Sequence, residues 1–221
     1  MEILRQTLSF ITNNGPVIFN LTAQHLSIVL VAVGLAVVTG VPIGIAITRN
    51  ERAARVVLYA ASILMTIPSM ALFGVLIPIL AVIGQGIGFL PAVIAIFLYS
   101  QLPIISNTYA AIRSVDPALR EAAGGMGMTG LQRVLWVELP VAAPLIIAGI
   151  RIAVVINIGI TAIAAYIGAG GLGFLIRVGI TQHDARQVIT GALCVSLLAI
   201  AADSLLFLAQ RAVRPPGSSR R

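Results

Sequence analysis

The sequence predicts an all-α membrane protein with about five transmembrane helices and a cytoplasmic two-helix loop. Three observations support this fold class. Of the 221 residues, 59% are hydrophobic and only 10% are charged, with a mean hydropathy of +1.05, whereas a soluble domain carries about 25% charged residues. Several apolar runs reach the length of about 20 residues that a helix needs to cross a bilayer. One long polar stretch, residues 116–140, separates two very apolar halves.

The first 20 residues are expected to form an extracytoplasmic or interfacial segment. Polar residues such as Arg5 and Gln6 interrupt its apolar residues, so it does not have the pattern of a signal peptide. A short interfacial helix and a frayed terminus are both open for this segment. The side chains that would make the apolar side of such a helix are Ile3, Leu4, Leu8 and Ile11. The transmembrane domain is expected over residues 21–210.

The first three spans follow from the positions of charge and glycine. Residues 26–48 carry no charge and make the first span, with His25 expected at its outer interface. The next uncharged run, residues 56–112, is too long for one helix. Its glycine-rich part at residues 84–88 divides it into a second span over residues 56–83 and a third over residues 89–111.

The second span contains the segment Thr66-Ile67-Pro68-Ser69. Proline frees backbone carbonyls and kinks a helix, and nearby hydroxyl groups can satisfy those carbonyls. Thr66, Pro68 and Ser69 are therefore candidates for lining or gating a pathway, together with Asn107 and Asn157. A kink that only shapes helix packing is the alternative.

The polar stretch at residues 116–140 predicts two short helices hinged on glycine. Asp116 can cap the first helix and Pro117 fits its first turn. Gly127 suits the left-handed conformation of a helix stop. Thr129 and Gln132 form a capping-box pattern at the start of the second helix, and Pro140 is expected to open the next span.

The fourth and fifth spans are expected over residues 141–166 and 188–209. They contain Arg151 and Asp203 at similar depths, which predicts an intramembrane ion pair, with snorkelling of Arg151 to the interface as the alternative. The glycine-rich run at residues 167–173 lacks the Lys and Ser/Thr of a P-loop, so it is no nucleotide site. Residues 173–187 read as a mixed loop or short re-entrant helix, and residues 211–221 as a disordered tail. No catalytic or metal site is expected.

Part of the polar stretch resembles the EAA loop of ABC-importer permeases. The matching residues are Glu121, Ala122, Ala123, Gly127, Leu139 and Pro140, with Val137 at a position where that family usually has Ile. In the family this loop docks on an ATPase subunit, so the resemblance implies that these residues couple ATPase motion to the spans. A plain amphipathic loop at the membrane surface is the alternative.

Other segments resemble the osmoprotectant permeases, which carry glycine betaine, choline or carnitine. They are residues 66–69, 106–109, 115–117, 149–151 and 167–173. The resemblance implies two permease chains, a substrate-binding protein, and ATPase partners that use ATP and Mg²⁺, with no cofactor on this chain. A methionine-type permease and an ion-coupled secondary transporter are the rival interpretations.

The arginines orient the chain, because basic residues accumulate on cytoplasmic loops. With five spans, ten arginines fall on the side of the polar loop, three fall on the other side, and Arg151 lies within a span. The ten are Arg49, Arg52, Arg55, Arg113, Arg120, Arg133, Arg211, Arg214, Arg220 and Arg221. We therefore expect a multi-pass protein of the bacterial cytoplasmic membrane, with the loop and the C-terminus inside and the N-terminus outside.

Overall fold

A computed structural model describes residues 2–213, and every regular element among them is helical. In chain order the elements are α1 (Glu2–Asn13), α2 (Gly15–Ala46), η1 (Ile47–Arg49), α3 (Glu51–Thr66), α4 (Ser69–Ala81), α5 (Phe89–Arg113), α6 (Pro117–Gly125), α7 (Gly130–Arg133), η2 (Val134–Glu138), α8 (Leu139–Ala164), η3 (Ala165–Ile167), α9 (Gly173–Thr181) and α10 (Ala185–Ala212). The all-helical fold predicted from the sequence is confirmed.

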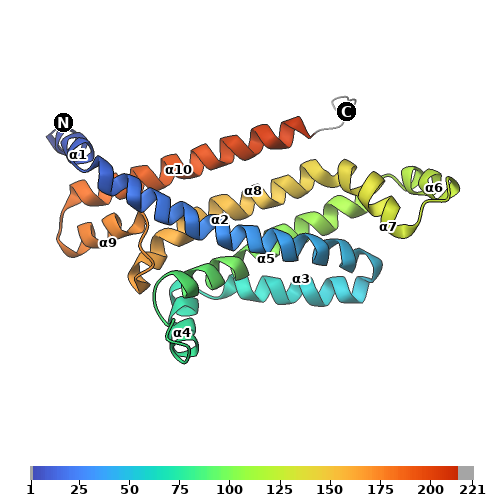
Figure 1. The fold of residues 1–221 in the computed structure, drawn as a ribbon, viewed down its shortest axis with the longest axis horizontal. Helices are drawn as coiled ribbons and strands as arrows, with labels where there is room; N and C mark the ends of the chain where they lie inside the picture. Colours follow the sequence, from blue (N-terminus) through green and yellow to red (C-terminus); the bar gives the residue numbers. More distant parts are fainter. Residues whose placement is uncertain (1, 214–221) are drawn as a thin grey trace.

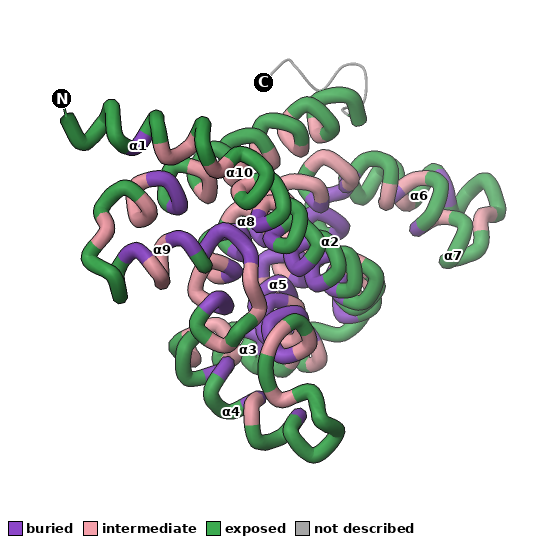
Figure 2. The backbone as a smooth tube through the Cα atoms, turned by 60° about the vertical axis from the view of Figure 1, so that its left-hand side comes forward, coloured by how far each residue is buried: buried purple, intermediate pink, exposed green. Residues whose placement is uncertain are grey.

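The long helices run along the long axis of the molecule, and α5 lies at their centre (Figure 1). In its most apolar stretch, 61% of the α5 residues are buried, against 39% for α2, 22% for the helix through α8 and none for α10. Figure 2 shows the same gradient, with buried backbone around α5 and exposed backbone along α10. The uncovered apolar faces of α8 and α10 therefore face lipid or another chain.

Glycine lets α2 approach α5 closely. A Cβ atom on Gly44 would lie 2.6 Å from the Cβ of Thr108, and one on Gly40 would lie 2.9 Å from Ile104 Cγ2. By contrast, a Cβ on Gly34 would meet nothing within 4 Å. Small residues in spans favour this kind of close packing, so two of the glycines in the first span serve helix contact.

The first span begins earlier than the sequence predicts. α2 starts at Gly15 rather than near residue 26, and His25 is fully buried rather than interfacial. The polar residues near the start of α2 have protein partners: Thr22 donates to the Ile18 carbonyl within the helix, and His25 Nε2 lies 3.0 Å from the Ile158 carbonyl. A buried polar group is tolerated when it is hydrogen-bonded, which explains the difference.

The second span is broken rather than kinked. α3 and α4 meet at 97°, so the single helix predicted over residues 56–83 is wrong, and counting the bent pair as one span gives five. The residue before a proline avoids the helical region, and Ile67 is extended, with a ψ of 125°. Its free carbonyl accepts a hydrogen bond of 2.6 Å from the Tyr99 hydroxyl on α5, which holds the break in place.

The second short helix of the polar loop continues directly into the fourth span. α7, the π-helical turn η2, α8 and η3 form one continuous helix from Gly130 to Ile167, so Pro140 does not open a separate helix. In the π turn the Leu139 amide donates to the Val134 carbonyl, five residues back. The wider turn comes immediately before Pro140, which has no amide hydrogen to donate.

The two ends of the molecule carry different elements. α1 and α9 lie at one end, whereas α6 and α7 project from the other (Figure 1). Residues 173–181, expected in a mixed loop or re-entrant helix, form α9, which packs against α10. Of the tail that was expected to be disordered, Arg211 and Ala212 belong to α10, and residues 214–221 lie outside the described part of the chain.

Candidate coupling loop and pathway residues

The polar loop is defined by its caps and by one left-handed glycine. The Asp116 carboxylate accepts from the Ala118 amide at 2.9 Å. Thr129 and Gln132 form the reciprocal capping box, with distances of 3.4 and 2.8 Å. Gly127 has a φ of +76°, a conformation that non-glycine residues rarely adopt. The local signals read from the sequence are therefore confirmed.

The EAA-like residues lie on different sides of α6. Ala123 is buried, whereas Glu121 and Ala122 are exposed. Leu139 is half-buried and Pro140 is exposed. The loop also exposes several large apolar side chains, of which Trp136 is 70% exposed. The others are Leu119, Met126, Leu131 and Leu135. A polar loop with so much exposed apolar surface has the character of a docking site.

Glu138 lies at the junction of this loop with α8 and was not singled out by the sequence reasoning. Its side chain is only 6% exposed, and its Oε1 lies 3.1 Å from Nε of Arg133 on α7 and 3.4 Å from Nε of Arg120 on α6. Arg120 also donates from Nη2 to the Ile112 carbonyl in the last turn of α5. One buried carboxylate therefore joins both short helices to the start of α8.

The candidate pathway residues differ in how accessible they are. Thr66 and Pro68 are exposed at the α3–α4 break, and Ser69 is half-buried. Asn107 is half-buried at a very close crossing of α5 and α8, where a Cβ on Gly149 would lie 2.5 Å from its Cβ.

Asn157 is fully buried between α5 and α8. Its Nδ2 donates to Ser100 Oγ and to the Ala153 carbonyl, both at 2.8 Å. Asn157 could therefore meet a substrate only if α5 and α8 rearranged, whereas Thr66 and Pro68 need no such movement. The lining or gating role of all five residues stays a prediction.

The structure brings Arg151 of α8 and Asp203 of α10 together. Arg151 donates from Nε and Nη2 to the two carboxylate oxygens, the second at 3.0 Å, and from Nη1 to Gln210 at 3.3 Å. The Phe207 ring centroid lies 5.1 Å from its guanidinium carbon. The two side chains are 30% and 37% exposed within the chain, so this bidentate pair sits on the open side of the α8–α10 interface.

Comparison with known proteins decides the family. The family model described as "Binding-protein-dependent transport system inner membrane component" matches residues 40–215. The chain belongs to this family of importer permeases. Among its relatives, Osmoprotectant import permease protein OsmW of Salmonella typhimurium is 54% identical, with 96% of this chain and 98% of that protein covered. Glycine betaine/carnitine/choline transport system permease protein OpuCB of Bacillus subtilis is 40% identical over 97% and 96% of the two chains.

Solved structures agree on the fold of the permease. A chain of the MetNI methionine ABC transporter in an inward-facing conformation matches with a TM-score of 0.79 and 26% identity, covering 87% of this chain and 94% of that one. A second crystal form gives a TM-score of 0.80 with 25% identity, covering 90% and 96%. The permease therefore has the type I ABC importer fold, and the interpretation as an ion-coupled secondary transporter is set aside.

In this permease, the glycine-rich turn after α8 packs on the start of α2. Gly168, Gly170 and Gly171 all have positive φ, and the Gly171 amide donates to Gln24 Oε1 at 3.2 Å. A Cβ on Gly171 would lie 3.2 Å from His25 Nδ1. The turn and the two polar side chains thus form one tightly packed junction at the end opposite the loop. No local pattern points to the role of His25, because its burial depends on which distant segment packs against it.

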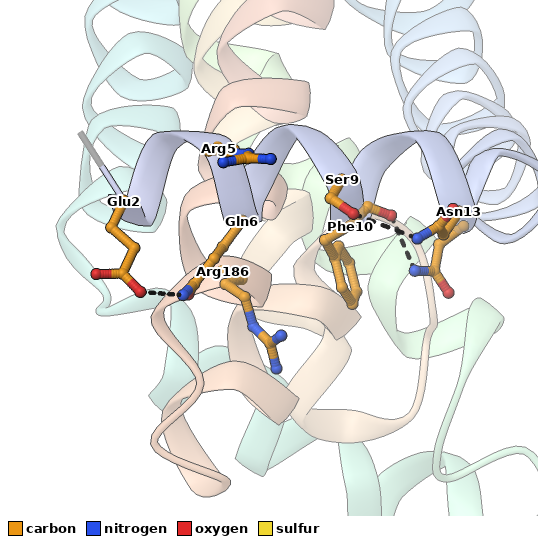
Figure 3. A pocket seen from close by; sticks show the side chains of 8 residues that line it. Glu2, Arg5, Gln6, Ser9, Phe10, Asn13 and Arg186 are labelled. Carbon is orange, nitrogen blue, oxygen red and sulfur yellow. Dashed lines mark hydrogen bonds between the residues drawn. The ribbon is translucent and has the colours of Figure 1, made fainter.

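A polar cleft of about 440 Å³ lies at the same end of the permease, between α1 and the start of α10 (Figure 3). Arg5 and Gln6 come from α1, and Arg186 comes from α10. Arg186 is also held by Asp184, which caps α10. The hydrogen bond from this guanidinium lowers the pKa of the Asp184 carboxyl to about 2. The cleft therefore presents a surface with fixed charges.

Proposed function

We propose that this chain is the permease subunit of an ATP-driven importer for quaternary-amine osmoprotectants such as glycine betaine, choline or carnitine. The observation that carries the proposal is the 54% identity to an osmoprotectant import permease over 96% of this chain. Further relatives at 37–41% identity are named as transporters of choline, carnitine or glycine betaine. Because these relatives are named for several different osmolytes, they support the class of quaternary amines and not one particular osmolyte.

The proposed importer contains two permease chains, two ATPase subunits and an extracytoplasmic binding protein. The uncovered apolar faces of α8 and α10 support a second permease chain, because the substrate path then forms between the two copies. The exposed apolar side chains of the loop support docking on the ATPase. In this proposal ATP and Mg²⁺ are bound by the ATPase partner, and the permease itself carries no cofactor.

The proposed orientation places the loop at 116–140 in the cytoplasm. Among residues 2–213, seven arginines flank the spans on the loop side and three on the other side. An excess of basic residues marks the cytoplasmic side. The cleft between α1 and α10 then faces outward, where a binding protein arrives. Glu121, Ala122 and Gly127 would transmit the ATPase motion, and Thr66, Pro68, Ser69 and Asn107 would border the path.

A methionine importer is the second candidate, because the two solved structures compared above come from a methionine ABC transporter. Their identity of 25–26% is about half that of the osmoprotectant relative, which favours the quaternary amines. The two candidates share the fold and the loop, so only the substrate separates them.

The deciding experiment is uptake by the complete importer in proteoliposomes. The permease is assembled with its cognate ATPase and binding protein, and labelled glycine betaine, choline, carnitine and methionine are offered separately. We expect ATP-dependent uptake of at least one quaternary amine, unchanged by a protonophore. Uptake of methionine alone would replace the proposed substrate class. Uptake driven by an ion gradient without ATP would overturn the proposed mechanism.

A further inference from the structure

The inference concerns Glu138 at the start of α8. α6 and α7 are joined by residues 126–129, in which Gly127 adopts a left-handed conformation. A Cβ on Gly127 would meet nothing within 4 Å, so no side chain packs against this position. The turn is hydrogen-bonded to α6, from Gly127 to Gly124 and from Met128 to Ala123, and these bonds do not tie it to α7. α7 is continuous with α8, whereas α6 is connected to α5 only through residues 114–116. The backbone alone would therefore let α6 turn against α7 about Gly127.

The buried carboxylate of Glu138 prevents this rotation of α6 against α7. Arg133 of α7 donates a hydrogen bond from Nε to Oε1 of Glu138, and the guanidinium of Arg120 on α6 forms an ion pair with the same oxygen at 3.4 Å. Arg120 at the same time donates from Nη2 to the Ile112 carbonyl of α5. The interaction is shielded from water on the Glu138 side, which is 6% exposed. Charge pairs shielded in this way are screened less than surface pairs. The nearby pair of Arg113 and Glu51 has side chains 47% and 76% exposed and is a surface pair of little consequence.

The position of Glu138 in the chain adds a second observation. It is the last residue of the π-helical turn that joins α7 to α8. Such turns are rare and occur often at functional sites, where they alter the direction of a helix. The carboxylate therefore lies at the point where a movement of the loop would become a movement of the span.

We propose that Glu138 is the positioning residue of the coupling loop. Its carboxylate locks α6 and α7 to the start of α8, so a displacement of the loop moves the span and is not absorbed at Gly127. This inference rests on the proposed function, in which an ATPase moves the loop. It adds a residue outside the EAA-like set and assigns it the transmission of the movement rather than contact with the ATPase.

The first test measures the ATP hydrolysed per substrate imported by the complete importer in proteoliposomes. Glu138→Gln keeps the size of the side chain and removes its charge. We expect uptake to fall about tenfold while ATP hydrolysis continues, which corresponds to about 1.4 kcal/mol of lost coupling. Glu138→Asp, with a charge on a shorter side chain, should give a smaller loss. Glu51→Gln is the matched control and should leave the ratio unchanged.

The second test needs no substrate. Amide hydrogen exchange of the assembled importer should speed up in residues 117–133 of Glu138→Gln and stay unchanged in Glu51→Gln. If Glu138→Gln does not assemble, Arg133→Gln takes its place, since it removes one partner from the same carboxylate. An unchanged ratio of ATP to substrate, or unchanged exchange in the loop, overturns the positioning role. If the wild-type importer carries no quaternary amine, the substrate proposal fails, whereas the exchange comparison still decides the role of Glu138.

Discussion

At the scale of single residues, position 127 requires glycine because of its backbone conformation, and not because a side chain would lack room there. Its φ is +76°, and a Cβ added there would meet nothing within 4 Å. A side chain in the left-handed region costs about 1–2 kcal/mol because its Cβ approaches the following carbonyl oxygen. The loop would relieve this strain only by rotating α6 against the contacts that hold it, the ion pair of Arg120 with Glu138 among them.

We therefore predict that Gly127→Val inserts normally into the membrane but supports little uptake. Membrane yield and transport by the complete importer measure the two effects. Gly124→Val is the control, because Gly124 lies within α6 at negative φ and is equally open to solvent. Full transport by Gly127→Val would show that the left-handed turn is not needed for coupling.

The residues whose roles could be predicted from sequence are those that interact with near neighbours in the chain. The caps at Asp116 and Thr129 depend on neighbours within three positions, so their side-chain chemistry was sufficient. Glu138 and His25 depend on residues 18 and 133 positions away in the chain (138 − 120 and 158 − 25). A single sequence holds no direct record of such contacts, and both residues were missed for that reason.

At the scale of elements, the break between α3 and α4 is held by one hydrogen bond from outside the pair. The Tyr99 hydroxyl donates to the Ile67 carbonyl at 2.6 Å, which satisfies a carbonyl that the break leaves without a helical partner. Proline and hydroxyl residues in the sequence indicated a kink here. The 97° angle could not be predicted, because it depends on how α4 packs against α5.

We predict that Tyr99→Phe lowers the free energy of unfolding by about 0.5–1.5 kcal/mol, the usual net value of one hydrogen bond. Thermal unfolding of the purified permease in detergent measures the effect. Tyr59→Phe serves as the control, because Tyr59 is 71% exposed. Equal stability of the two variants would mean that packing alone holds the break.

The ion pair between α8 and α10 gives a prediction about the assembly of the importer. Arg151→Ala strands the Asp203 carboxylate, and Asp203→Ala strands the guanidinium, on a face that the membrane surrounds. Each single variant should lower the yield of assembled importer, and the double variant should recover part of the loss. Yields on native gels test this cycle. If the loss of yield in the double variant equals the sum of the two single losses, the interaction between Arg151 and Asp203 contributes nothing to assembly.

At the scale of the whole molecule, the number of spans and the type of fold could be predicted because both follow from hydrophobicity and length. The ends of the helices could not, because a polar residue can be buried against a distant segment, as His25 of α2 is against α8. The two ends of the molecule are distinct: α6 and α7 at one, α1 and α9 at the other (Figure 1). The proposed mechanism requires that the first end meets the ATPase, and the orientation is therefore its most demanding test.

Three exposed positions decide that orientation: Gln85 between α4 and α5, His183 between α9 and α10, and Gln132 in α7. Single cysteines at these positions are placed in a Cys194→Ser background, which removes the native thiol. With an impermeant thiol reagent on intact cells, we expect labelling at Gln85→Cys and His183→Cys and none at Gln132→Cys. Permeabilised cells should label at all three positions, which controls for reactivity. Labelling of Gln132→Cys in intact cells would place the loop outside, where no ATPase can dock, and the proposed coupling would fall with it.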